Sequence, residues 1–190
     1  MNKMELLDLL KSSGVIMEGH FLLTSGRHSG RFLQCSKLLQ YPERAAAVCK
    51  MMVRPFIDKG IETVIGPAMG GVILSYETAR ALGARAVFAE KEGERMVLRR
   101  GFSLETGEKV LVVEDAVSTG GSVQKVIDLL KVVNADIVGV ALIVDRTAGR
   151  FDPGVPVNAL LEMDVESYAP AECPLCRTGI PLQKPKDGAL

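Results

Sequence analysis

Short apolar runs alternate with segments of helical spacing through the middle of this chain. Four such runs, at 63–66, 84–89, 110–114 and 137–144, predict buried strands. Between them, apolar residues recur at steps of three and four, as in the segment 122–133. Strands that alternate with helices of this length are typical of a parallel sheet with helices on both faces. We therefore expect an α/β fold built on a doubly wound, mostly parallel sheet.

The beginning of the chain lacks this alternation. Residues 4–12 have the leucine spacing of a short amphipathic helix, whereas residues 15–40 have no helical period and predict extended structure with tight turns. A further helix is expected from Pro42, whose fixed φ suits a first helical turn, to about residue 60. Pro55 falls inside that helix and should kink or shorten it.

The segment 90–109 interrupts the pattern because it is dense in charge and lies between two predicted strands. We expect it to form a flexible hairpin, called the flap below. Residues 157–163 predict an edge strand, and residues 169–190, which include four prolines, predict an irregular wrap. We expect a single domain, 1–190, with a sheet core at about 41–156 and a small cap made of about 1–40 and part of 157–190.

Composition and charge argue against several kinds of partner. Lys and Arg total 23, as do Asp and Glu, so no net charge favours nucleic acid or an anionic membrane. No stretch approaches the roughly 18 uninterrupted apolar residues of a membrane span. We expect a cytoplasmic protein with no nucleic-acid or membrane partner.

The four cysteines do not form the pattern of a disulfide framework. Cys173 and Cys176 have the spacing of half a Cys₄ zinc site, but no second CxxC or HxxxH completes it. The two histidines, His20 and His28, are too few for a histidine-based metal centre. The CPLC segment therefore predicts a structural turn, with a zinc ion bridging two subunits as the alternative.

The segment 110–122, VLVVEDAVSTGGS, carries the candidate chemistry. Its apolar run predicts a buried strand, and Glu114 and Asp115 follow at the carboxyl end, where open α/β sheets bind ligands. The turn to the next helix is predicted at 116–122, where glycines permit close backbone approach and hydroxyl groups are frequent. The free N–H groups and positive dipole of a helix N-terminus favour an anion there.

Two common nucleotide sites do not fit this segment. A Walker-type loop has a lysine directly after its second glycine, whereas the first lysine here is Lys125, one turn into the helix. The GxGxxG fingerprint of dinucleotide-binding folds is absent as well. Carboxylates beside an anion site suit vicinal hydroxyls or a hydrated Mg²⁺, so the segment indicates a sugar phosphate as ligand.

VLVVEDAVSTGGS resembles the phosphoribosyl pyrophosphate (PRPP) signature of the type I phosphoribosyltransferases. The resemblance implies the fold of that family, Mg²⁺ as cofactor and PRPP as substrate. It also implies that Glu114 and Asp115 hold the ribose hydroxyls. The residues implied to bind the 5′-phosphate are Ala116, Val117, Ser118, Thr119, Gly120, Gly121 and Ser122. The alternative is an ordinary strand, turn and helix with incidental acids.

Three further segments resemble the orotate phosphoribosyltransferases within that family: FLLTSGRHSGRFLQC at 21–35, GPAMGGVIL at 66–74 and VDRT at 144–147. The resemblance implies transfer of ribose 5-phosphate from PRPP to orotate, giving orotidine 5′-monophosphate and pyrophosphate in pyrimidine (UMP) biosynthesis. It implies orotate binding by Ser118 and Arg146, whose guanidinium suits the orotate carboxylate. The alternative for Arg146 is an ion pair with Asp145 or Asp152. A purine phosphoribosyltransferase and a PRPP-sensing regulator remain as alternative functions.

The family's pyrophosphate cations are matched only in part. Many orotate enzymes carry a lysine near Gly70 and another at Thr24, which leaves Arg27 and Arg31 as candidate replacements. In the flap, Lys91 matches a basic position of the family, and Arg95 or Arg99 stands where others are expected. The family also implies a homodimer that shares active sites through this flap. The alternative is a solvated hairpin in which Glu90, Glu92 and Glu94 pair with these bases.

The expected catalytic residues are therefore Lys91, Arg95, Glu114 and Asp115, with Lys91 also binding PRPP. No side chain is expected to ligate a metal directly.

Overall fold

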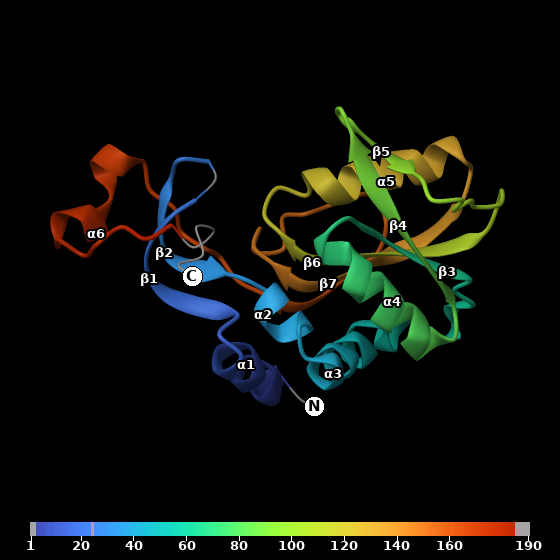
Figure 1. Cartoon of the computed structure of the whole chain (residues 1–190), viewed down its shortest axis with the longest axis horizontal. Coiled ribbons are helices and arrows are strands. Elements are labelled where there is room, and N and C mark those ends of the chain that lie inside the picture. Colours follow the sequence, from blue (N-terminus) through green and yellow to red (C-terminus); the bar gives the residue numbers. More distant parts are fainter. Residues whose placement is uncertain (1–2, 24, 185–190) are drawn as a thin grey trace.

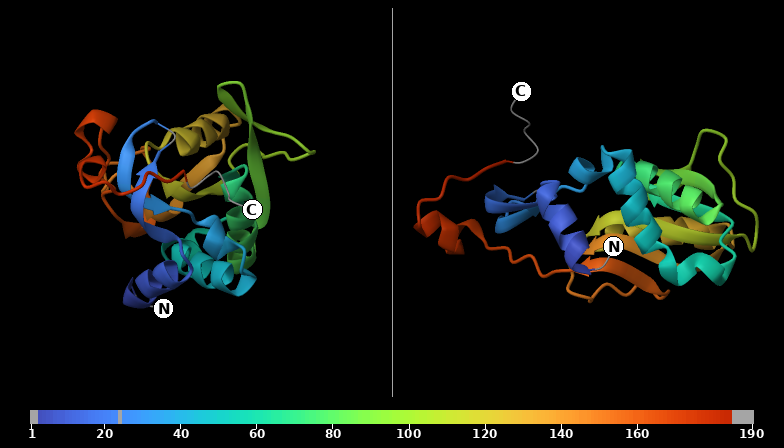
Figure 2. Two further views of the ribbon diagram at one scale, coloured as in Figure 1. Left: turned by 60° about the vertical axis from the view of Figure 1, so that its left-hand side comes forward. Right: turned by 90° about the horizontal axis from the view of Figure 1, so that it is seen from below.

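The computed structural model describes residues 3–23 and 25–184. A helix-covered sheet forms the larger part of the molecule, and a smaller part containing β1, β2 and α6 extends from one end of it (Figure 1). Figure 2 shows that the two parts lie end to end, which makes the molecule elongated. The smaller part is the predicted cap.

The main sheet has six strands in the order β5-β4-β3-β6-β7-β8. All neighbouring pairs are parallel except β4 and β5, which form an antiparallel hairpin. This confirms the predicted α/β class and the mostly parallel sheet. The strands are β3 (Thr63–Pro67), β4 (Arg85–Glu92), β5 (Arg95–Leu98), β6 (Lys109–Val117), β7 (Asp136–Asp145) and β8 (Val157–Glu162).

Alternate residues of the central strands pack on opposite faces of the sheet. One face contributes Leu111 and Ile143 to a core shared with the N-terminal helices, and the other contributes Val112 to a core shared with α5. Each of these side chains is fully buried. The near-continuous apolar runs of the sequence follow from burial on both faces. The helices on these faces are α3 (Pro42–Met52), α4 (Gly70–Leu82) and α5 (Gly121–Val132).

The helix expected at 42–60 is interrupted, as Pro55 predicts. The α-helix α3 ends at Met52, and a 3₁₀ segment, η1 (Arg54–Lys59), carries the chain to Gly60. Proline has no backbone N–H and so cannot continue the helical hydrogen-bond ladder. Gly60 then ends the segment with a φ of 67°.

The cap combines both ends of the described chain. Backbone hydrogen bonds join His28 to Tyr168 in both directions, and Leu22 and His20 to Gln183. The expectation of extended structure at 15–40 is confirmed for two strands, and a short helix follows them. The elements of the cap and its connections are α1 (Lys3–Ser12), β1 (Ile16–Leu22), β2 (His28–Leu33), α2 (Ser36–Leu39), η2 (Pro170–Glu172) and α6 (Pro174–Arg177).

The carboxyl end of β6 differs from the prediction. Ala116 and Val117, expected in the turn, continue the strand because they pair with Val144 and Asp145 of β7. The turn therefore begins at Ser118, and Glu114 and Asp115 lie within the strand. Among the described residues, no helix has the length and apolar content needed to cross a membrane.

Candidate functional site

The candidate site lies next to β3, where the order in which the chain adds strands to the sheet reverses. From β3 the chain crosses through α4 to β4 on one side, whereas β6 lies on the other side of β3. Open α/β sheets bind ligands at such a switch point, outside the carboxyl ends of the strands. A side chain at Gly70 would lie 3.2 Å from a carboxylate oxygen of Asp115, so the loop after β3 directly faces the acids of β6.

The loop after β3 is packed tightly against the helix that follows it. A Cβ at Gly66 would lie 2.7 Å from the carbonyl oxygen of Gly71, and a Cβ at Gly71 would lie 2.8 Å from Gly66. Both positions therefore require glycine for packing. At Gly70 the atoms nearest to an added Cβ belong to the Asp115 carboxylate, the end of a side chain that can move. The structure gives no steric reason for the absence of the lysine expected near this position.

The loop after β6 forms a small anion-sized cavity. Its volume is about 60 Å³, and Glu114 and the residues from Ala116 to Val123 line it. Gly120 starts α5 with a φ of 80°, and a Cβ there would lie 2.3 Å from the Phe151 ring. Among the residues that the structure describes, no side chain caps α5, so its first N–H groups are free to bind an anion. The structure thus brings together the residues predicted to hold the 5′-phosphate.

Glu114, which is buried and lines this cavity, forms an acidic pair with the half-buried Asp115. Glu114 is 8% exposed, and its side chain accepts a hydrogen bond from the Asp115 backbone N–H at 3.1 Å. Burial, and next the charge of Asp115, raise the pKa of Glu114 to about 8. Burial likewise raises the pKa of Asp115. Hydroxyl donors of a bound sugar would replace the solvation that these carboxylates have lost.

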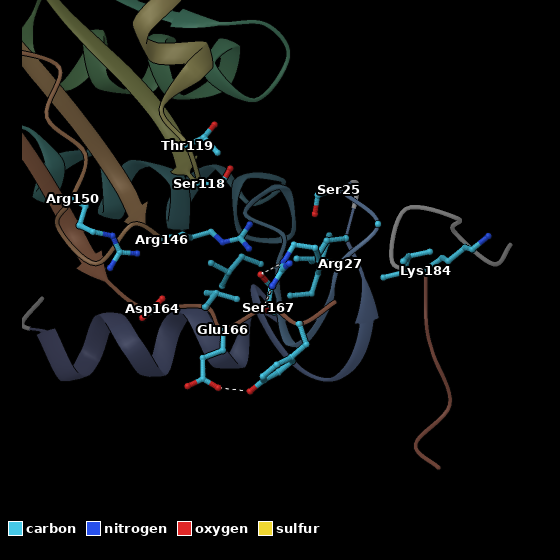
Figure 3. Close-up of a pocket in the computed structure, with 17 residues that line it drawn as sticks. Ser25, Arg27, Ser118, Thr119, Arg146, Arg150, Asp164, Glu166, Ser167 and Lys184 are labelled. Atoms are coloured by element: carbon cyan, nitrogen blue, oxygen red, sulfur yellow. Dashed lines mark hydrogen bonds between the residues drawn. The ribbon is translucent and has the colours of Figure 1, made fainter. Parts of the chain in front are cut away.

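A second, much larger cavity adjoins the phosphate loop. Its volume is about 1390 Å³, and Ser118 and Thr119 line both cavities. Arg146, from the turn after β7, points into the open space between the loop and the cap (Figure 3). Arg150 lines the cavity from the same turn, and the remaining walls come from the cap: residues 22–23, 25–27, 32–33, 164–168 and Lys184.

The guanidinium of Arg146 has no partner within the described part of the chain. Its Nε is buried and has no hydrogen-bond partner among the described residues. The Asp145 carboxylate instead accepts bonds from Thr147 N at 2.7 Å, Thr147 Oγ1 at 2.6 Å and Gly149 N at 3.1 Å. Burial lowers the pKa of Arg146. Within residues 3–23 and 25–184, no ion pair to Asp145 or Asp152 is formed, so that alternative is not supported.

The two arginines considered as pyrophosphate cations have different surroundings. Arg27 lies in the large cavity but already donates to Ser167, from Nε to Oγ at 2.9 Å and from Nη2 to the carbonyl oxygen at 2.5 Å. Arg31 lies 3.9 Å from Glu18 and lines a separate cavity of about 480 Å³. Thr24, the position of the other missing lysine, lies outside the described residues.

The flap is a hairpin of β4 and β5 in which most bases pair with acids. Arg95 lies 3.8 Å from Glu92, Arg99 also pairs with Glu92, and Arg100 lies 2.8 Å from Glu90. Across the tip, Glu94 lies 2.8 Å from Lys125 of α5. Lys91 forms no ion pair within the described part of the chain. The flap extends from the carboxyl end of β4, and the site lies at the carboxyl ends of the parallel strands, on the same side of the sheet. However, no flap residue lines any of the three cavities.

Several cavity residues had no signal in the sequence. Arg150 and Lys184 add cations to the large cavity, and residues 164–168 form one wall. Nothing in their local pattern distinguishes them from other surface residues. Arg150 reaches the cavity from the turn after β7, whereas Lys184 and residues 164–168 reach it because the cap pairs the C-terminal segment with the β1–β2 hairpin.

Comparison with known proteins agrees with this geometry. The family model of the phosphoribosyl transferase domain matches residues 35–168. Orotate phosphoribosyltransferases of Caldicellulosiruptor bescii and Thermotoga maritima are 51% and 52% identical to this chain over 185 and 183 residues. These alignments cover 97% and 96% of this chain and 97% and 98% of those proteins. The chain belongs to the orotate phosphoribosyltransferase family.

Solved structures confirm the type I phosphoribosyltransferase fold. The orotate phosphoribosyltransferase of Aeropyrum pernix matches 83% of this chain and 93% of its own, with a TM-score of 0.71 at 24% identity. The adenine phosphoribosyltransferase of Rhodothermus marinus matches 84% of this chain and 99% of its own, with a TM-score of 0.69 at 23% identity. Enzymes that act on different bases therefore share this fold.

Proposed function

We propose that this chain transfers the ribose 5-phosphate group of PRPP to orotate, giving orotidine 5′-monophosphate and pyrophosphate in pyrimidine (UMP) biosynthesis. The observation that carries the proposal is the unpaired Arg146 guanidinium in a cavity that shares Ser118 and Thr119 with the phosphate loop. A guanidinium fork suits the orotate carboxylate, which a neutral purine lacks. Ser118, from the shared wall, contacts the same base.

The phosphate loop and the acidic pair position the sugar. The 5′-phosphate occupies the small cavity and accepts bonds from the free N–H groups of the loop and α5. Glu114 and Asp115 accept hydrogen bonds from the ribose hydroxyls. As pyrophosphate leaves, positive charge develops on the sugar, and ionised carboxylates nearby stabilise it. Catalysis then consists mainly of positioning and electrostatic stabilisation.

Mg²⁺ fits the chemistry of this site as a partner of pyrophosphate. Mg²⁺ prefers oxygen ligands and usually keeps several of its water molecules. The carboxylates and hydroxyl groups around the switch point can accept hydrogen bonds from such a hydrated ion. When bound, Mg²⁺ neutralises charge on the leaving group. The close approach of Gly70 to Asp115 keeps the loop after β3 beside the acids, where its backbone can contact pyrophosphate.

The flap completes the site from a second copy of the chain. Lys91 forms no ion pair among the described residues, and Arg95 has only a distant pair to Glu92 at 3.8 Å. Both are exposed at the sheet edge that carries the site. In a homodimer they bind pyrophosphate in the partner's site, and closure of the flap excludes water. We further propose that residues 1–190 form one domain and that the enzyme acts in the cytoplasm.

The test of this function is steady-state formation of orotidylate, followed by ultraviolet absorbance, with adenine, hypoxanthine and xanthine as competing acceptors. We expect turnover with orotate and Mg²⁺ and none with the purines. Loss of one charged hydrogen bond of about 1.5–3 kcal/mol predicts that Arg146→Ala raises the KM for orotate by roughly 10- to 150-fold. The KM for PRPP should change little.

Arg150→Ala is the matched control, because Arg150 is an exposed arginine of the same turn that also lines the cavity. We expect it to change the orotate KM much less than Arg146→Ala does. Equal, small effects of Arg146→Ala on both KM values would remove this residue from the base site. Turnover of a purine in preference to orotate would refute the proposed function itself.

A further inference from the structure

A cluster of four potential metal ligands lies in the cap, outside the site described above. His20 from β1 and His28 from β2 meet Cys173 and Cys176 from the C-terminal segment. One ligand atom of each residue lies within 4.8 Å of the other three. The two imidazoles and Cys173 are buried, whereas Cys176 is exposed. The four side chains thus form a compact group with one exposed member.

The distances within the cluster are close to those of a tetrahedral site. Zn–S bonds of about 2.3 Å and Zn–N bonds of about 2.05 Å place two nitrogens about 3.4 Å apart and a nitrogen and a sulfur about 3.6 Å apart. Here His20 Nε2 lies 3.0 Å from His28 Nδ1 and 3.5 Å from Cys173 Sγ. Cys176 Sγ lies 3.7 Å from His20 Nε2 and 3.3 Å from His28 Nδ1.

The hydrogen bond behind His20 fixes its tautomer. Nδ1 of His20 lies 2.7 Å from the carbonyl oxygen of Ile180, which can only accept. His20 therefore carries its proton on Nδ1, and the lone pair on Nε2 points toward His28 and both sulfurs. Histidines that ligate metals are commonly held in this way, with the other ring nitrogen donating to a backbone carbonyl.

The part of the cap around the cluster, formed by residues 16–34 and 164–184, has few other buried side chains. In its two segments, residues 16–34 and 164–184, five side chains are buried among the described residues: His20, Phe21, His28, Ser29 and Cys173. Three of these five belong to the cluster, so apolar burial is small. Small units without a sufficient hydrophobic core are often stabilised by disulfides or a metal ion, and no cysteine here is in a disulfide.

We propose that His20, His28, Cys173 and Cys176 bind one structural zinc ion per chain. Two thiolates and two imidazoles with four ligands and no open position are typical of closed zinc sites. The ion joins the β1–β2 hairpin to the C-terminal segment, and both of these line the large cavity. It acts within one chain, unlike the zinc bridge between two subunits suggested by the lone CxxC. Its role is to hold the base-binding cap in place.

The first test is the metal content of full-length protein purified without chelators, measured by mass spectrometry of the elements. We expect about one zinc ion per chain. Replacement by Co²⁺ should give the thiolate charge-transfer absorption and intense visible bands of a tetrahedral site. Absence of stoichiometric zinc, both as purified and after incubation with zinc and desalting, would overturn the proposal. So would a Cys173–Cys176 disulfide in protein purified without oxygen.

Two alanine variants assign the ligands. Cys176→Ala removes an exposed thiol at the cluster, and Cys49→Ala is the matched control because Cys49 is a free cysteine in the sheet core. We expect Cys176→Ala to lose the zinc and the Co²⁺ absorption and to become more sensitive to proteolysis within 164–184. Cys49→Ala should keep the metal. Equal zinc content in the two variants would show that the ion binds elsewhere.

Discussion

Substitution of Glu114 tests the electrostatics of the acidic pair directly. The pKa of this carboxyl is raised from 4.5 to about 8, chiefly by burial. Between these values the folded chain holds a proton that the unfolded chain has lost. A rise in pH therefore favours the unfolded state, and the stability of the ligand-free protein falls across this interval. Below about pH 4.5, Glu114 contributes no pH dependence.

The size of the effect follows from the shift in pKa. Each pKa unit corresponds to about 1.36 kcal/mol, so a shift of this size limits the total loss to roughly 5 kcal/mol. For a chain of this length, a loss of about 1.36 kcal/mol per pH unit corresponds to a fall in Tm of roughly 3–5 °C per pH unit. Glu114→Gln, which is neutral at every pH, should flatten the Tm profile between pH 5 and 8.

The assay is calorimetry or dye-detected melting of the ligand-free protein at half-unit pH steps, at constant ionic strength. Glu43→Gln is the control, since Glu43 is an exposed acid on α3 that does not contribute to the pKa shifts of the acidic pair. We expect its profile to follow that of the unmodified protein. Parallel profiles for Glu114→Gln and the unmodified protein would refute the reasoning about burial. In addition, PRPP binding near pH 7 should release protons, because the ribose hydroxyls donate to the ionised carboxylate.

Two further predictions concern the loop and the flap. Gly120→Ala should lower the Tm and abolish PRPP binding, because its φ is positive and the new Cβ would lie 2.3 Å from Phe151; calorimetric titration with PRPP checks this, and wild-type affinity would contradict it. If Lys91 acts in the partner's site, a mixed dimer of one Lys91→Ala chain and one Arg146→Ala chain has one intact site and one site that lacks both residues. About half of the dimers reconstituted from equal amounts of the two variants are mixed, so we expect on the order of a quarter of the normal activity. Activity no higher than that of either variant alone would argue against a shared site.

The parallel sheet and the phosphate loop were predictable because both depend on local patterns. Apolar runs indicate strands buried on both faces, and the acids and glycines between 110 and 122 are contiguous in the chain. The end of β6 was not predictable in this way. Whether Ala116 and Val117 belong to the strand depends on pairing with β7, which local composition does not determine.

The cap is the part that sequence reasoning could not assemble. His28 lies opposite Leu22 in the hairpin, but the register of β1 shifts between Glu18 and Phe21, so strand alternation alone does not predict that His20 meets His28. The contact of His20 with Cys173 depends on packing between two segments that lie about 150 residues apart in the sequence. Only the CxxC spacing was visible beforehand. The wall formed by residues 164–168 had no comparable signal.

The large cavity is formed by two distant parts of the chain, and this sets the order in which its walls are synthesised. Five of the six strands of the main sheet and the phosphate loop precede residue 150, whereas the wall at 164–168 and Lys184 emerge from the ribosome later. The residues around the small cavity are therefore synthesised before this wall, and the large cavity is complete only when the C-terminal segment has returned to the first hairpin.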